Sequence, residues 1–296
     1  MSSVALQQGS HSPAPTVAQT LMQRETRVTY GEVPKALSGE PIGETSWQLQ
    51  GDRFLLRGEG HHYFHYRKGH GITVERGPDA DLSEESLWLN GSVYSAIASL
   101  NGLVPIHASA VAHRGRVFAF SAPAAGGKST LAAALAGYGL PLFCDDTLVL
   151  DLSDPDQVLC LPGHKRLKLR PDAIELTGAT PEEPVSKAVD KYYASPAAGD
   201  VGVALPIAEL IFLEEGPNLE IEPINGAQRM VRLRGDHPAA DLFAAAQHFD
   251  RAAHFAHLHR LASQIKMARL ERPRDRSRFT ESVALAAQYV VNGGQR

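Results

Sequence analysis

The residues with the clearest chemical potential are Lys128 and Ser129, which directly follow Gly127. The apolar run 117–120 precedes their loop, and the good helix formers of 131–136 come after it. Strand, glycine-containing loop, Lys-Ser and helix is the order typical of phosphate-binding loops, in which unpaired N–H groups and the helix dipole attract phosphate oxygens. We therefore expect a nucleotide-binding loop formed by Ala122, Ala125, Gly126, Gly127, Lys128, Ser129 and Thr130.

Two alanines depart from the usual pattern of such loops. Ala122 stands where the motif has its first glycine, and Ala125 occupies another position that is often glycine. A methyl group disfavours left-handed backbone geometry by about 1 kcal/mol, so only Gly126 and Gly127 are fully permissive. The alternative interpretation is an ordinary strand–turn–helix whose lysine and serine are solvated.

Two adjacent acids, Asp145 and Asp146, end the apolar run 142–144, seventeen residues beyond Lys128. A strand that ends in acids presents carboxylates at the sheet edge where ligands gather in open α/β sheets. One carboxylate can hold magnesium while the other accepts a proton from an attacking hydroxyl. The alternative is a pair of turn-forming aspartates. Upstream, His107 is flanked by apolar residues, which is more typical of a core histidine than of a catalytic one.

Three segments together resemble the catalytic domain of HPr kinase/phosphorylase and its bacterial relatives, which include kinases of lasso-peptide precursors. These segments are Ile106-His107-Ala108-Ser109-Ala110, Gly127-Lys128-Ser129-Thr130 and Asp145-Asp146, and the stretch 162–173 is also similar. The resemblance covers residues 100 to 290. It implies that Lys128 and Ser129 hold phosphate and metal, that Asp145 is the base for the acceptor hydroxyl, that Asp146 supports the metal or the acceptor geometry, and that His107 lies near the γ-phosphate.

The chain departs from that family at Lys168, which falls where the family has an acid of a Glu-Ile-Arg signature. The replacement puts a cation where a second metal carboxylate is expected, and this cation could contact phosphate or an acidic substrate. The family's long glycine-rich signature is missing after this point, so the reverse, phosphorylase activity is not expected.

The chain as a whole is expected to be an α/β protein, with a P-loop kinase domain of the HPr kinase type and a small β-rich N-terminal domain. We expect a disordered tail over residues 1–22, because this segment is rich in Ser, Gln, Pro and Ala without an apolar period. Short β-type runs broken by glycines predict a small antiparallel sheet within residues 23–100. Residues 101–296 form the predicted catalytic domain, with further strands near 209–213 and 265–270 and helices over 239–263 and 280–291.

Composition narrows the choice of partners and compartment. The 296 residues carry a formal net charge of -4, which gives no global attraction to nucleic acid or anionic lipid. No apolar run approaches the ~20 residues needed to span a bilayer, and the N-terminus lacks the pattern of a signal peptide. Two cysteines, Cys144 and Cys160, fit a reducing cytosol, so we expect a cytoplasmic protein without a membrane partner.

Weaker features leave alternatives open. Lys165, Arg166, Lys168 and Arg170 could line the cleft or form a solvated strand face. Lys191 lies in a loop-like stretch and could contact phosphate. His248, His254, His257 and His259 recur on one predicted helix but lack a convincing metal-ligand set. Cys144 is interpreted as a small core residue.

The sequence thus predicts an ATP- and Mg²⁺-dependent kinase acting on a hydroxyl, most simply that of serine, in a peptide, protein or small molecule. The alternative is a non-catalytic nucleotide-binding regulatory module that derives from an HPr kinase-like ancestor; Ala122, Ala125 and Lys168 motivate it. The identity of the acceptor and any homo-oligomeric assembly are not encoded in a readable way.

Overall fold

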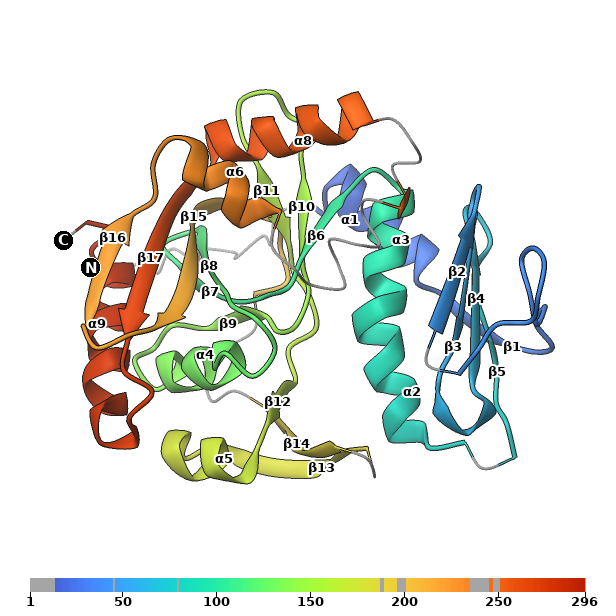
Figure 1. Ribbon diagram of the computed structural model, residues 1–296, viewed down its shortest axis with the longest axis horizontal. Coiled ribbons are helices and arrows are strands. Elements are labelled where there is room, and N and C mark those ends of the chain that lie inside the picture. Colours follow the sequence, from blue (N-terminus) through green and yellow to red (C-terminus); the bar gives the residue numbers. More distant parts are fainter. Residues whose placement is uncertain are drawn as a thin grey trace, which may run out of the picture.

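The protein is a mixed α/β structure with several sheets (Figure 1). The computed structural model describes residues 14–44, 46–78, 80–186, 189–195, 201–234, 245–246 and 251–295. Figure 1 shows a small sheet at one end, a large central sheet at the other, and a long helix between them. Among the described residues, none of the helices has the length and apolar character needed to cross a bilayer.

The first described element is helix α1, Val17–Glu25. Thr16 and Gln19 form a reciprocal capping box, in which each side chain accepts a hydrogen bond from the other residue's backbone N–H over 3.2 Å and 3.1 Å. The expectation of a disordered tail over residues 1–22 is therefore wrong for its last part, because this cap starts a helix within it. Residues 1–13 lie outside the described residues.

The N-terminal sheet contains five strands in the order β1-β5-β4-β3-β2. They span Val28–Tyr30 (β1), Ser46–Gln50 (β2), Arg53–Arg57 (β3), Tyr63–Arg67 (β4) and Gly71–Glu75 (β5), with the short turn η1 at Glu59–His61. Strands β2 to β5 pair in antiparallel hairpins as expected, but β1 pairs with β5 in parallel. The direction of β1 differs because it arrives directly from α1 and adds to an edge, without a hairpin turn.

One helical stretch connects the two sheets. It consists of α2 (Leu82–Trp88), the π-helical turn η2 (Leu89–Val93) and α3 (Tyr94–Leu100). Val93 and Ile97 pack in one core with side chains of the N-terminal sheet and with Val149 and Leu161 of the central sheet. The two sheets therefore share a core through α3, and a domain boundary near residue 100 stays a prediction.

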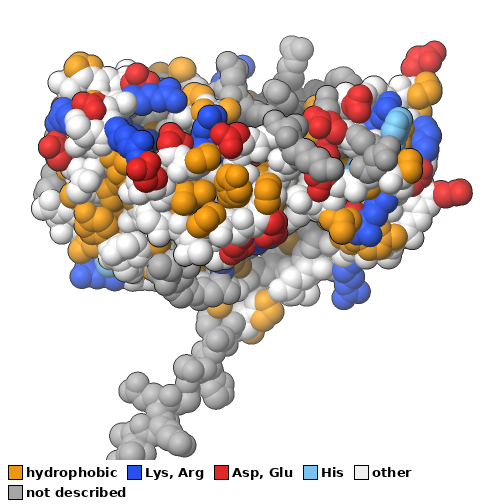
Figure 2. Space-filling model, turned by 90° about the horizontal axis from the view of Figure 1, so that it is seen from below, with side chains coloured by type: hydrophobic (Ala, Val, Ile, Leu, Met, Phe, Trp, Pro, Cys, Tyr) orange, Lys and Arg blue, Asp and Glu red, His pale blue; other side chains and the backbone are white. Residues whose placement is uncertain are grey.

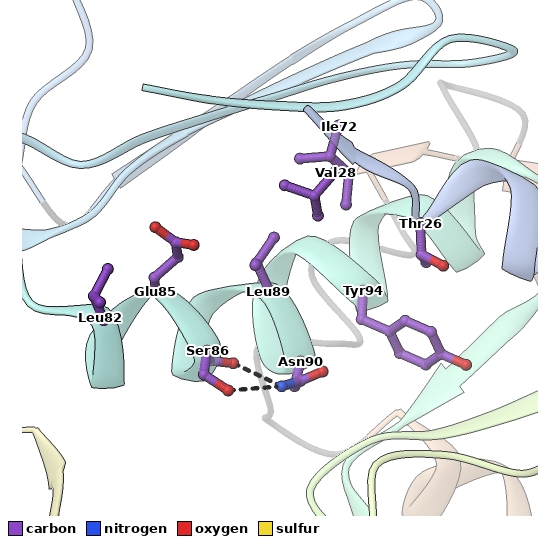
Figure 3. Close-up of a pocket in the computed structure, with 9 residues that line it drawn as sticks. All are labelled: Thr26, Val28, Ile72, Leu82, Glu85, Ser86, Leu89, Asn90 and Tyr94. Carbon is purple, nitrogen blue, oxygen red and sulfur yellow. Dashed lines mark hydrogen bonds between the residues drawn. The ribbon is translucent and has the colours of Figure 1, made fainter. Parts of the chain in front are cut away.

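A cavity of about 340 Å³ lies between this helical stretch and the N-terminal sheet (Figure 3). Leu82, Glu85 and Leu89 point from the helix toward Val28 and Ile72. None of the residues that line this cavity belongs to the site predicted from the sequence.

The central sheet has nine strands, and β6-β10-β11-β15-β8-β7-β9 is the order along its main path, with β17 beside β15 and β16 beside β17. The strands are Val104–Ile106 (β6), Ala108–His113 (β7), Arg116–Ser121 (β8), Leu142–Cys144 (β9), Leu148–Asp151 (β10), Leu159–Leu161 (β11), Leu205–Glu215 (β15), Glu220–Pro223 (β16) and Lys266–Arg272 (β17). Strands β8, β15 and β17 are parallel to one another.

Helices cover both faces of the central sheet. Successive side chains of a strand point to opposite faces, so each strand contributes to the core on either side. Phe118 and Phe120 of β8 pack in the core that contains α4 (Lys128–Ala136) and α9 (Phe279–Val291). Val117 and Ala119 pack in the opposite core. That second core receives side chains of α6 and α8, which span Ala227–Leu233 and Arg251–Gln264.

The remaining elements form a small layer next to α4. Strands Leu167–Leu169 (β12), Thr180–Ser186 (β13) and Val189–Ser195 (β14) make a three-stranded sheet in the order β12-β14-β13, with helix α5 (Pro171–Thr177) beside it. The turn η3, Arg276–Arg278, leads into α9. On the face seen in Figure 2, acidic and basic side chains are interspersed and do not gather by sign.

The predicted C-terminal helices are found with adjusted bounds. The helix expected over 280–291 is confirmed as α9. The helix expected over 239–263 agrees with α8 in its second part, while residues 235–244 and 247–250, and with them His248, lie outside the described residues.

Candidate functional site

The sequence-predicted residues meet at one edge of the central sheet. Strands β8 and β9 run in the same direction, because both are antiparallel to β7, which lies between them. The register pairs Ala108 with Ser121 and Ala110 with Cys144, so β7 starts where β8 and β9 end. The loop after β8, His107 before β7 and the acids after β9 are thereby brought to the same place.

The loop predicted to bind phosphate, residues 122–127 and called the phosphate loop below, is followed by α4, whose first residue is Lys128. The Lys128 side chain is buried, with 6% of its surface exposed. Its Nζ donates hydrogen bonds to the carbonyl oxygens of Ala122 over 2.8 Å and Pro123 over 3.2 Å. The ammonium group is therefore held against the start of the loop at the N-terminal end of a helix, where an anion is favoured.

The loop backbone needs its two glycines and strains one alanine. Gly127 has a φ of 80°, and a Cβ at Gly126 would lie 2.5 Å from the Ala122 Cβ. Ala125 adopts a φ of 62°, a left-handed geometry that the sequence flagged as unfavourable for alanine. The chain thus takes the turn despite the missing glycine, at a local energetic cost.

Asp145 is buried and accepts hydrogen bonds from two serines. Its side chain has 1% exposed surface, and its Oδ1 accepts hydrogen bonds from the hydroxyls of Ser109 over 2.5 Å and Ser129 over 2.8 Å. Its Oδ2 lies 3.3 Å from the backbone nitrogen of Lys168. Asp145 and Ser129 thus bring two oxygen ligands of the kind that Mg²⁺ prefers to the first turn of α4.

Asp146 occupies a strained three-residue turn. The Thr147 N–H donates to the Asp145 carbonyl over 2.9 Å, and Asp146 between them has a φ of 70°. This turn aims the second carboxylate in a different direction from the first. The Asp146 side chain keeps 28% exposure, and its Oδ2 lies 2.7 Å from Lys168 Nζ while its Oδ1 lies 3.3 Å from His107 Nδ1.

His107 contacts Asp146 through the same ring nitrogen twice. Nδ1 is 2.9 Å from the Asp146 carbonyl oxygen and 3.3 Å from its carboxylate, and both groups only accept hydrogen bonds. Burial, followed by the charge of Lys128, lowers the pKa of His107. The imidazole is then neutral at pH 7 with its proton on Nδ1, which holds Asp146 in place.

Burial is also the main influence on the pKa of Lys128. It lowers the pKa of Lys128 to about 8, while Asp146 and Asp145 oppose this shift and Lys191 adds to it. For Asp146, burial raises the pKa, but Lys168 and His107 outweigh it and the net pKa is lowered. At pH 7 the Asp146 carboxylate therefore faces the ammonium groups of Lys128 and Lys168, and the charge of Lys191 also acts on Lys128.

Scans against protein-family models and against curated proteins find no match. Among solved structures, the HPr(Ser) kinase/phosphatase from Coxiella burnetii is similar, at 14% sequence identity and a TM-score of 0.34. The similar region covers 64% of this chain and 94% of that chain. The relationship is a distant structural one.

The structure brings most of the predicted site residues together, with Thr130 on the first turn of α4. The basic cluster divides: Lys168 joins Asp146, whereas Arg166 pairs with Glu182 and Glu183, and Arg170 is exposed. Cys144 is buried as expected. Among the residues that the structure describes, no three His, Cys, Asp or Glu side chains gather as metal ligands.

Sequence reasoning missed three neighbours of this site. Ser109 shares Asp145 with Ser129, as described above. A Cβ at Gly91 of η2 would lie 3.5 Å from Asp146 Oδ2, so the helix from the N-terminal region borders the second carboxylate. Arg272 reaches the phosphate loop from the end of β17. Its place at the carboxyl end of a predicted strand was the signal that could have found it.

Proposed function

We propose that this chain is a kinase that transfers the γ-phosphate of ATP to an acceptor hydroxyl, most simply that of a serine. The observation that supports the proposal most is that two adjacent carboxylates differ in burial and in their partners. Asp145 is buried against Ser129, whereas Asp146 is partly exposed and held by Lys168 and His107. Phosphoryl transfer needs one acid beside the metal and one beside the attacking hydroxyl.

In this proposal the nucleotide phosphates lie on the phosphate loop. The N–H groups at the start of α4 and the Lys128 ammonium group attract the β- and γ-phosphates, and Lys191 adds positive potential. Ser129 and Asp145 would hold Mg²⁺, which supplies charge neutralisation to the phosphate oxygens when it is bound.

The proposed roles of the two aspartates are exchanged relative to the expectation from the sequence. Asp145 is 1% exposed and accepts its described hydrogen bonds from Ser109, Ser129 and the Lys168 backbone, so an incoming acceptor reaches Asp146, with 28% of its side chain exposed, more readily. We infer that Asp146 aligns the acceptor hydroxyl and takes its proton. The acceptor oxygen then bonds to the γ-phosphorus, the bond to the β–γ bridging oxygen breaks, and ADP leaves with that electron pair.

Substitution of the two aspartates by asparagine tests this assignment. Asparagine tolerates the left-handed backbone of residue 146, so Asp146→Asn preserves the turn. We expect Asp146→Asn to bind Mg²⁺ and ATP like the wild type but to transfer phosphate about 10² to 10⁴ times more slowly. Asp145→Asn should lose the gain in ATP affinity that Mg²⁺ provides.

Binding is measured by calorimetry with ATP, with and without Mg²⁺. Transfer is measured as labelled phosphate incorporated into serine-containing peptides and small hydroxyl compounds. An Asp146→Asn protein that transfers at the wild-type rate would remove this residue from the role of base. Tight ATP binding by the wild type without transfer to any acceptor would favour the non-catalytic nucleotide-binding module.

A further inference from the structure

Arg272 is the last residue of β17, at the same sheet edge as the phosphate loop. Strand β15 pairs with β8 on one side, where Phe212 is opposite Ser121, and with β17 on the other, where Glu215 is opposite Arg272. Arg272 therefore lies three residues, or about 10 Å along the strand direction, beyond Ser121, the residue that precedes the loop. From there its side chain extends over the loop.

The guanidinium group of Arg272 contacts the two glycines before Lys128. Its Nη2 donates a hydrogen bond to the Gly126 carbonyl oxygen over 3.0 Å. A Cβ at Gly127 would lie 2.5 Å from this nitrogen, so the glycine is what lets the guanidinium group approach. The cation thus lies at the N-terminal end of α4, where the helix dipole is already positive.

No carboxylate among the described residues lies in ion-pair reach of Arg272. The neighbouring Glu271 binds Arg269 over 3.0 Å, and Arg274 lies 3.6 Å from Glu215. The influences that lower the pKa of Arg272 are burial and the charge of Arg274, and neither is an acid. A guanidinium group stays protonated under such conditions, so its charge remains without an opposite charge.

The N-terminal end of α4 thus gathers the Lys128 ammonium group and a half-buried arginine; the two aspartates act on the charge of Lys128, but neither pairs with Arg272. Both cations are bound to the backbone of the same loop, Lys128 at Ala122 and Pro123 and Arg272 at Gly126, and the positive end of the helix favours an anion there. We propose that Arg272 is a second phosphate-binding cation of this site, which grips the phosphate chain of the nucleotide from β17 while Lys128 grips it from α4. The inference rests on the proposed nucleotide binding and names a residue that completes it.

Three substitutions separate a phosphate contact from a structural one. Arg272→Gln retains an N–H donor for the Gly126 carbonyl but removes the charge. Arg272→Lys retains the charge but lacks the planar pair of N–H donors of the guanidinium group. Arg274→Gln is the matched control, because Arg274 is an exposed arginine two residues away. Calorimetry measures the affinity of each purified protein for ATP and for inorganic tripolyphosphate, both with Mg²⁺, at constant pH and ionic strength.

We expect Arg272→Gln to weaken both ligands by roughly ten- to hundredfold, the range of a lost charge-assisted hydrogen bond. Arg272→Lys should lose less, and Arg274→Gln should bind like the wild type. If Arg272→Gln binds both ligands with wild-type affinity, the proposal is overturned and Arg272 only holds the loop. If Arg272→Gln loses affinity for ATP but not for tripolyphosphate, the proposal is also overturned, because Arg272 then contacts the nucleoside and not the phosphates. If the wild-type protein binds neither ligand, the proposed function fails together with the inference.

Discussion

The hydroxyl of Ser129 donates a hydrogen bond to Asp145 Oδ1 over 2.8 Å, so the first turn of α4 is tied to the end of β9. Ser109, the second residue of β7, donates to the same oxygen over 2.5 Å. The two serines are chemically alike but differ in place: Ser129 is the second residue of α4, beside the phosphate loop, whereas Ser109 is fully buried in β7.

We predict that Ser129→Ala reduces the gain in ATP affinity that Mg²⁺ provides by about tenfold, because a metal ligand is lost. Ser109→Ala should instead lower the free energy of unfolding by roughly 1–3 kcal/mol, because the buried carboxylate of Asp145 loses a donor. Calorimetry with and without Mg²⁺ and urea unfolding measure the two effects. Ser129→Thr, which retains the hydroxyl, is the control, and an unchanged Mg²⁺ effect in Ser129→Ala contradicts the assignment.

The lowered pKa of Lys128 predicts a pH dependence of ATP binding. In the free protein this pKa is about 8, so the ammonium group loses its proton as the pH rises through 8, whereas bound phosphate favours the protonated form. The dissociation constant for ATP should therefore rise by about tenfold per pH unit above pH 8. Lys128→Arg keeps its charge throughout and should give a flat profile between pH 7 and 10. A flat wild-type profile refutes the assigned shift.

Much of this site could be predicted because its signals are local. The strand, loop and helix around Lys128 follow each other directly, and the strand that ends in Asp145 has an apolar pattern of its own. The proposed roles of the two aspartates, metal ligand and base, depend on the turn at Asp146 and on partner residues from β7 and β12. No local sequence pattern encodes this turn or these contacts. Arg272 was missed because it is 146 residues from the Gly126 that it contacts. The N-terminal helix was missed because its capping box lies in a segment of disorder-like composition.

The strained Ala125 gives a test of the loop. Its φ of 62° is left-handed, so Ala125→Gly should raise the free energy of unfolding by roughly 0.5–1 kcal/mol while ATP still binds. Ala124→Gly, at the neighbouring position without a positive φ, is the control and should be neutral or destabilising. Urea unfolding distinguishes the two. Equal effects at both positions would show that the backbone at residue 125 is not strained in solution.

The buried pair between Lys168 and Asp146 gives a prediction about the pH profile of transfer. Lys168 Nζ lies 2.7 Å from the carboxylate and is the largest of the influences that keep the pKa of Asp146 low. A base must be ionised to accept a proton, so transfer should decline only as the pH falls through this low pKa. The same pair stabilises the fold above the ordinary pKa of an aspartate, and this contribution is lost as the pH falls through the folded-state value.

Lys168→Met removes the cation and keeps the length of the side chain. The pKa of Asp146 then rises, because the largest influence that opposed burial is lost, and the acidic limb of kcat should shift to higher pH. Transfer rates between pH 4.5 and 9 measure this shift. Urea unfolding should show a loss of roughly 1.5–3 kcal/mol in the free energy of unfolding at pH 7, the range for a hydrogen bond to a charged group, and this loss should shrink at lower pH. Arg166→Met, on the same segment but paired with Glu182, is the matched control and should leave the acidic limb in place. If Lys168→Met lowers the rate equally at every pH, the lysine acts on the substrate and not through Asp146.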